Sequence, residues 1–372
     1  MLLSELPTPQ VVVDRIRLLR NISRVQELAT AAGVALRPHA KTHKSPAIAK
    51  WQIERGAAGI CCAKVGEAEV MAAHGIGNIR LAYPVNPSNA CRVLAVMERV
   101  SLSIVVDHLA VARAWSEVMH RADRLLDVLV KVDVGFHRCG IDPEAPAALD
   151  FIRSVASLPG LHLRGLLSHA GHGYQATTED ELRVIACRES EILEALRRGA
   201  AGAGIALEEI SVGATPTLRF ITRQPGVTEV RPGNYVYFDR TQLALGAASL
   251  DDCALTVLAT VVSKPAADRV ILDCGSKTLT TDVARGFEAA PGYGAVLVPG
   301  ATAIDSTLAI ERLSEEHATV RVAGHTPLEP GDRVRVLPNH ACVVVNMVDE
   351  VLLVDDERVI DKLPVAARGK IA

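Results

Sequence analysis

The chain has 372 residues, of which 49% are hydrophobic and 22% charged, and its formal net charge is −3. This length allows two domains, and the absence of a basic excess argues against nucleic acid as a partner. No run of about 18 apolar residues is present, so we expect no membrane span. The eight cysteines show no CxxC spacing, which favours reduced thiols and a cytoplasmic location.

Apolar residues recur at three-residue steps from Ile16 to Leu28, and this spacing predicts an opening helix. Eight strand-like runs follow, most of them separated by helix-length segments. Eight such units in roughly 230 residues predict a closed (β/α)8 barrel, with a doubly wound open sheet as the alternative. The runs cover residues 35–41, 59–64, 79–85, 102–107, 126–135, 163–171, 209–214 and 229–238.

The pattern changes after about residue 245, where runs such as CALTVLATVVS, DRVRVLPN, ACVVVNM and EVLLVDD are divided by Pro, Gly and Asp turns. Such runs are typical of β-strands and predict a second, mostly antiparallel β domain. We therefore expect a barrel over residues 1–245 and a β domain over residues 246–372. Polar residues collect at the carboxyl ends of the barrel strands, where parallel barrels hold their active sites, so the pattern favours an enzyme.

The segment ALRPHAKTHKS, residues 35–45, is unusually rich in cationic and protonatable groups. On a strand, Arg37, His39 and Lys41 share one face, and an inward face would bring them together near the rim of the barrel. A lysine among other cations gives up its proton more readily and can act as a base or as a covalent nucleophile. The alternative is a solvated basic strand end without a ligand. His43 and Lys44 receive no role from this pattern.

Two later segments offer groups that suit an anion. Arg138 lies in a glycine-flanked loop directly after a strand, where its guanidinium would face an anion, although a surface arginine fits equally. In ISVGATPT, Gly213, Ala214 and Thr215 supply backbone N–H groups and a hydroxyl suited to phosphate, as do the late loops of many barrels. Tyr235, on the last predicted strand, is a candidate donor to the same anion or a core residue.

The segment SHAGHGY places His169 and His172 at the end of the sixth predicted strand. Imidazoles at this rim can orient a substrate or transfer protons, and a single structural hydrogen bond is the alternative role.

In the β domain, His340 and Cys342 are two residues apart, so both would point to one face of a strand. An imidazole and a thiolate form half of a zinc site and leave positions for water and substrate. A buried cysteine beside an exposed histidine is the alternative.

Six segments, RPHAKTHK, VDVGFHRCG, SHAGHGY, SVGATPT, EVRPGNYVYFD and PNHAC, resemble the D-serine dehydratase and D-threonine aldolase family. These are pyridoxal-phosphate enzymes with an alanine racemase-like fold, and the resemblance covers nearly the whole chain. It implies that Lys41 forms the covalent link to pyridoxal 5'-phosphate, with Arg37 and His39 as electrostatic neighbours. It also implies that Arg138 faces the cofactor ring and that the cofactor phosphate is held by Gly213, Ala214, Thr215 and Tyr235. The metal pair would be His340 and Cys342, which would bind a divalent metal (zinc, or else manganese or magnesium).

The reaction that this resemblance implies is elimination from a β-hydroxy-D-amino acid, as in D-serine dehydratase, giving a keto acid and ammonia. The His-x-Cys pair favours it, because several aldolases carry His-x-Asp instead. The alternative is retro-aldol cleavage to glycine and an aldehyde, with His169, His172 or a metal-bound hydroxide as the base. A racemase and a non-catalytic pyridoxal-phosphate carrier are further alternatives. The expected partners are a small-molecule substrate and, by analogy with fold relatives, a second copy of the chain in a homodimer.

Overall fold

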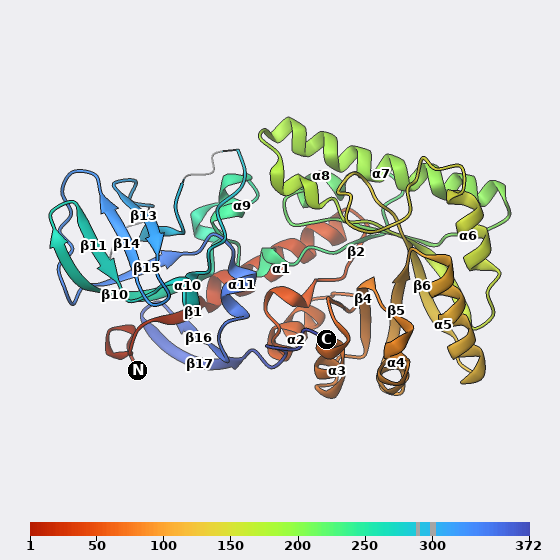
Figure 1. The fold of residues 1–372 in the computed structure, drawn as a ribbon, viewed down its shortest axis with the longest axis horizontal. Helices are drawn as coiled ribbons and strands as arrows, with labels where there is room; N and C mark the ends of the chain where they lie inside the picture. The colour runs from red at the N-terminus through yellow and green to blue at the C-terminus, as the bar shows by residue number, and fades with distance from the viewer. Residues whose placement is uncertain (288–290, 298–302) are drawn as a thin grey trace.

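The structure is a computed structural model, and it describes residues 1–287, 291–297 and 303–372. Figure 1 shows a β domain on the left and a barrel with its surrounding helices on the right. Helix α1 (Arg15–Ala31), which matches the predicted opening helix, leads from the first strand toward the barrel. None of the helices in the described ranges has both the length and the apolar character that a membrane crossing requires.

The barrel is built from eight parallel strands, each close to a predicted run. They are β2 (Ala35–Leu36), β3 (Ile60–Cys62), β4 (Asn78–Pro84), β5 (Ser101–Val106), β6 (Leu126–Lys131), β7 (Leu161–Leu167), β8 (Glu209–Val212) and β9 (Glu229–Val230). Their order around the sheet is β2-β9-β8-β7-β6-β5-β4-β3. The two ends meet through a parallel bridge between His39 and Cys61 and a hydrogen bond from Cys61 N to Pro38 O at 2.8 Å. The predicted barrel is confirmed.

Helices cover the outside of the barrel strands and bury their apolar faces against them (Figure 1). The barrel part of the chain holds α2 (Pro46–Glu54), α3 (Val65–Ala73), α4 (Ala90–Met97), α5 (Leu109–Arg121), α6 (Ala148–Ala156), α7 (Glu179–Gly202), α8 (Leu218–Ile221) and α9 (Arg240–Ala244). Strands β5 and β6 are almost fully buried, as expected for a parallel sheet with both faces covered.

The β domain is a nine-stranded sheet. It consists of β1 (Gln10–Asp14), β10 (Leu255–Ala266), β11 (Arg269–Leu272), β12 (Ala295–Leu297), β13 (Leu308–Leu313), β14 (Ala318–Val322), β15 (Arg333–Leu337), β16 (Glu350–Asp355) and β17 (Arg358–Pro364), with short helices α10 (Ser276–Leu279) and α11 (Ala341–Val345). Six of the strands close into a ring, because β10 pairs with both β11 and β15. The predicted, mostly antiparallel β domain is confirmed.

Two details of the β domain depart from the sequence pattern. Strand β1, from the start of the chain, pairs antiparallel with β10 and parallel with β16, so this sheet also contains residues that precede the barrel. The division at residues 245 and 246 stays a prediction. The run ACVVVNM, predicted as a strand, is the helix α11. Its first backbone N–H, that of Ala341, donates to Asp239 Oδ2 at 3.0 Å, so a contact from another segment overrides the β propensity of three valines.

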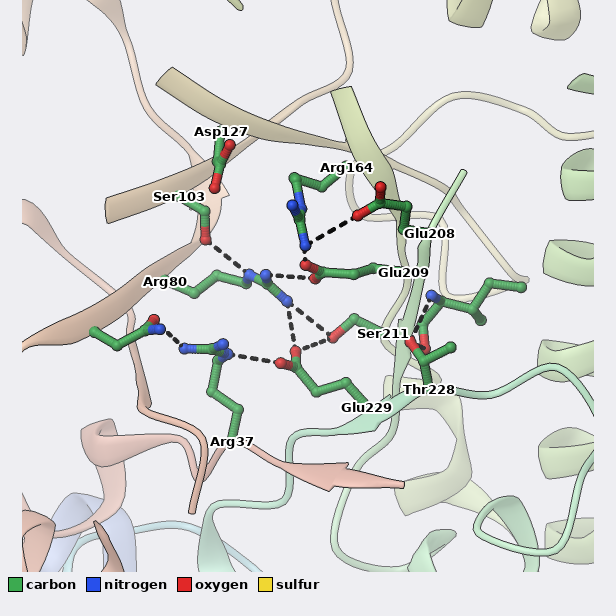
Figure 2. A network of polar contacts seen from close by, with 12 residues as sticks. Arg37, Arg80, Ser103, Asp127, Arg164, Glu208, Glu209, Ser211, Thr228 and Glu229 are labelled. Carbon is green, nitrogen blue, oxygen red and sulfur yellow. Dashed lines mark hydrogen bonds and ion pairs between the residues drawn. The ribbon is translucent and has the colours of Figure 1, made fainter. Parts of the chain in front are cut away.

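A buried network of charges fills the barrel interior near the starts of the strands (Figure 2). Glu229 accepts from Arg37 Nε at 2.7 Å and from Arg80 Nη1 at 2.5 Å, and Arg80 Nη2 donates to Glu209 at 2.6 Å. Burial alone would raise the pKa of Glu229, but Arg80 and Arg37 lower it to about 2. The prediction that Arg37 shares a face with Lys41 at the rim is therefore wrong: Arg37 belongs to this interior network.

Replacement of Glu229 by Gln should destabilise the fold by about 3–5 kcal/mol, because it removes the carboxylate shared by two buried guanidinium groups and leaves Arg37 without its anionic partner, while Arg80 keeps Glu209. Since the folded pKa of about 2 lies below the ordinary value of 4.5, this stabilisation is present above about pH 4.5 and is lost as the pH falls toward 2. Urea unfolding across this pH window measures both effects. Glu208→Gln is the matched control, because its side chain is 62% exposed in a surface pair with Arg164. Equal losses in the two variants would contradict the prediction.

Candidate active site

A cavity of about 320 Å³ opens where the carboxyl ends of the barrel strands face the β domain. Its volume lies within the range of small-molecule sites, about 300–1,000 Å³. The barrel contributes residues that follow β2, β6, β7, β8 and β9, and the β domain contributes residues around α10 and α11. Both parts of the chain are therefore needed to form the site.

Lys41 lines this cavity from a short 3-10 helix, Ala40–Thr42, which follows β2 after the intervening residues 37–39. The helix starts at His39, whose Nδ1 accepts from Lys41 N at 3.4 Å. Arg37 points into the interior network deeper in the barrel, whereas His39 and Lys41 follow it along the chain and reach the cavity. Lys44 lies outside the cavity, where its Nζ donates to Asn346 at 2.7 Å and pairs with Glu67 at 3.3 Å.

His39 and His169 both line the cavity and are neutral, since burial and then the nearby Lys41 lower the pKa of each well below its ordinary value. His169 Nδ1 lies 3.3 Å from Gly213 O, and its ring packs edge-on against Phe136 with 6.2 Å between ring centroids. His172 is half-buried and is not part of the cavity wall. Of the two predicted rim histidines, the structure brings only His169 to the site.

Of the predicted anion-binding residues, those of the Gly213–Thr215 turn line the cavity and Tyr235 does not. Gly213, Ala214 and Thr215 line the cavity, and Gly213 has a φ of +106°, which suits glycine. Thr215 is 4% exposed, and its hydroxyl faces the phenol of Tyr174, which also lines the cavity. Tyr235 is fully buried beside Gln52, whose Nε2 donates to the tyrosine hydroxyl at 3.0 Å, and it lies outside the cavity wall.

Three cationic side chains accompany Lys41 on the barrel side of the cavity. Arg138 is exposed there, with its guanidinium 5.1 Å from the ring centroid of Phe136. Arg231 and Lys131 were not predicted, although both stand at the carboxyl end of a barrel strand, which is the signal that could have found them. Burial, and then Arg231, lowers the pKa of Lys131 to about 7.

His340 and Cys342 come together in the cavity wall at the first turn of a helix, with Cys342 Sγ 3.2 Å from Thr42 Oγ1. The prediction that a strand aligns them is wrong: His340 has extended backbone angles and precedes α11, and Cys342 is the second residue of that helix. Burial would raise the pKa of Cys342, yet His340 lowers it, and Cys342 in turn raises the pKa of His340 to about 10. His340 therefore favours the thiolate form of Cys342, the form that binds metals.

The donor set fits a metal that keeps open positions. In the described residues, no group of three or more His, Cys, Asp or Glu side chains is arranged to hold a metal ion. One imidazole and one thiolate therefore leave coordination positions for water or a substrate oxygen. His340 Nδ1 lies 2.8 Å from Asp282 Oδ2, and Asn339 Nδ2 donates to Asp282 O at 2.8 Å. A carboxylate on one ring nitrogen is the usual device for orienting a histidine ligand, and no local motif points to Asp282.

The barrel and the β domain each match a known family model. Residues 13–241 match the N-terminal domain of alanine racemase. This match assigns the protein to the class of alanine racemase-like proteins. Residues 254–354 match a putative serine dehydratase domain. The chain belongs to the family that joins these two domains, and the resemblance inferred from its motifs is confirmed.

Relatives of this chain extend over nearly its whole length. It is 35% identical to a D-threo-3-hydroxyaspartate dehydratase from Delftia sp., over 91% of each chain. It is 33% identical to a D-threonine aldolase from Arthrobacter sp., over 99% of this chain and 94% of the relative. A solved D-threo-3-hydroxyaspartate dehydratase, a cysteine-to-alanine variant described as metal-free, has a TM-score of 0.91 and 31% identity over 98% of both chains.

Proposed function

We propose that this protein is a pyridoxal-phosphate- and divalent-metal-dependent lyase that acts on β-hydroxy-D-amino acids by β-elimination. The observation that carries the proposal is that Lys41 and the His340–Cys342 pair line one cavity, where Cys342 Sγ lies 3.2 Å from the hydroxyl of Thr42, the residue after Lys41. A substrate of amino-acid size can then meet an amine and a metal-binding pair within the same cavity. The names of the relatives, a dehydratase and an aldolase, fit this class of reaction.

The cavity suits pyridoxal phosphate in both shape and charge. We assign the covalent link to Lys41, the phosphate to the Gly213–Thr215 turn, and further contacts to His39 and Arg138. The left-handed backbone of Gly213 at this turn and the surrounding cations support this assignment. Tyr235 is not brought to the cavity, and we do not assign it to the phosphate. The bound cofactor supplies an electron sink for negative charge that develops at Cα.

Residues of the chain can be assigned to the proton transfers and to the hydrogen bonds of the reaction. We assign removal of the Cα proton to the amine of Lys41, which would act as the base. His39 and His169, both neutral, can accept or donate hydrogen bonds without adding charge. His340 and Cys342 would hold the metal, and a metal there acts as a Lewis acid on the β-hydroxyl. The thiolate favours zinc over manganese or magnesium, which prefer oxygen ligands.

Product analysis tests the proposal. Protein loaded with pyridoxal phosphate and zinc is incubated with D-serine, with L-serine as the matched control. We expect pyruvate and ammonia in equal amounts from D-serine, none from L-serine, and loss of turnover after treatment with a chelator. Failure to consume D-serine and every other β-hydroxy-D-amino acid would refute the proposal.

Retro-aldol cleavage remains the second candidate, because one relative is named a D-threonine aldolase. It requires a base for the β-hydroxyl, and His169 in the cavity wall is placed for that role, whereas His172 lies outside it. A racemase would need a second base on the opposite face of the cofactor. A pyridoxal-phosphate carrier resembles the barrel alone, so the second matched domain argues against it.

We also propose that the protein is a homodimer and that it is located in the cytoplasm. The cytoplasmic location is supported by the eight free cysteines.

Arg285 offers a test of which substrates are preferred. It lines the same wall as His340, three residues after Asp282, so it lies on the side where a metal would hold the β-hydroxyl. A second carboxylate on Cβ would meet its guanidinium. Arg285→Gln should therefore lower kcat/KM for D-threo-3-hydroxyaspartate about 10- to 100-fold more than for D-serine, the loss of about one charged hydrogen bond. Arg269→Gln, an exposed arginine of β11 outside the cavity, is the control, and an unchanged substrate ratio in Arg285→Gln would contradict the prediction.

A further inference from the structure

Arg231 connects the buried charge network of Figure 2 with the cavity. It is 5% exposed, lies just beyond β9 and lines the cavity wall. Its Nη1 donates to Ser211 Oγ at 2.5 Å, and its Nη2 donates to the carbonyl oxygen of Ser168. An arginine side chain can adopt many rotamers in an open site, but these two hydrogen bonds hold the Arg231 guanidinium in a single orientation.

Ser211 receives its own orientation from Glu229. The Ser211 hydroxyl donates to Glu229 Oε1 at 2.5 Å while its oxygen accepts from Arg231. Donation to a carboxylate makes a hydroxyl oxygen a stronger acceptor, so the two bonds reinforce one another. The register of the barrel makes this arrangement possible, since Ser211 of β8 pairs with Glu229 of β9 and both point inward.

Glu229 is fixed in turn by Arg37 and Arg80, as described above. Glu229 and Arg231 are two residues apart, so they follow one another on the inward face as the chain leaves β9. The carboxylate therefore lies one layer beneath the guanidinium. A chain of contacts runs from the buried arginines through Glu229 and Ser211 to Arg231 at the cavity.

We propose that Ser211 and Glu229 are positioning residues that hold the Arg231 guanidinium toward the cofactor. The proposal rests on the proposed function, because it takes pyridoxal phosphate as the occupant of the cavity. Without the Ser211 hydroxyl, Arg231 keeps its bond to Ser168 O but loses the one that ties it to the carboxylate. Its charge would then shift relative to the cofactor, and the absorbance of the cofactor would report that shift.

Ser211→Ala and Ser103→Ala form a matched pair for the test. Ser103 is also buried in the network, where it accepts from Arg80 Nε at 2.9 Å, and no contact to Arg231 is found for it in the described residues. The measurements are the absorbance spectrum of bound pyridoxal phosphate across pH, the Kd for the cofactor, and kcat and KM with D-serine. Ser211→Thr, which keeps the hydroxyl, tests rescue.

We expect Ser211→Ala to move the absorbance maximum or its pH midpoint and to lower kcat about tenfold with little change in KM. Ser103→Ala should keep the wild-type spectrum, and Ser211→Thr should restore it. A wild-type spectrum in Ser211→Ala, or an equal change in both alanine variants, would overturn the positioning role while leaving the proposed function intact. Failure of the wild-type protein to bind pyridoxal phosphate would instead overturn both.

Discussion

Replacement of Lys41 by alanine should abolish the covalent attachment of pyridoxal phosphate and lower turnover by at least about 10²–10⁴-fold. The reason is that Lys41 is assigned both the covalent link and the Cα proton. Borohydride reduction of the loaded protein, followed by mass spectrometry of its peptides, should place the reduced cofactor on Lys41 in the wild type and on no residue in the variant.

Lys44 provides the control for this result. It lies three residues from Lys41 but is held by Glu67 and Asn346 outside the cavity. Lys44→Met should therefore retain the reduced cofactor on Lys41. A labelled Lys44, or attachment that survives in Lys41→Ala, would show that the anchor has been assigned to the wrong lysine.

Replacement of Cys342 by alanine should remove the bound metal and most of the elimination activity, and it should leave the absorbance of the cofactor unchanged. A Lewis acid on a leaving hydroxyl contributes several kcal/mol, so we expect a loss of at least about 10²-fold. Metal content is measured by mass spectrometry of the digested protein, alongside the cofactor spectrum. Cys91→Ala is the control, since this thiol is exposed and outside the cavity. Full activity in a metal-free Cys342→Ala protein would remove the metal from the mechanism.

Most of the fold could be predicted from the sequence, because each barrel strand is a short apolar run beside a helical pattern. The prediction extended several strands too far at their carboxyl ends. The segment at residues 35–41 is a strand only over Ala35–Leu36, and the segment at 229–238 only over Glu229–Val230. In both places polar residues leave the sheet to line the site, and no period in the sequence marks that change.

The candidate site was predictable where a motif is local. Lys41, His169, the Gly213–Thr215 turn and the His340–Cys342 pair all line the cavity. The errors arise where tertiary contacts decide. Glu229 holds Arg37 in the barrel interior, below the cavity that Lys41 lines, and the contact of Ala341 with Asp239 turns the segment after His340 into a helix. Asp282 reaches His340 across 58 positions of sequence, a contact that no spacing rule could indicate.

Elimination as the reaction of this cavity is tested most directly by the products formed from D-threonine, on which the two candidate reactions diverge. The protein is loaded with pyridoxal phosphate and zinc, incubated with D-threonine, and the products are quantified by chromatography. Our account predicts 2-oxobutanoate and ammonia in equal amounts. Glycine and acetaldehyde as the main products would contradict it and establish aldol cleavage instead.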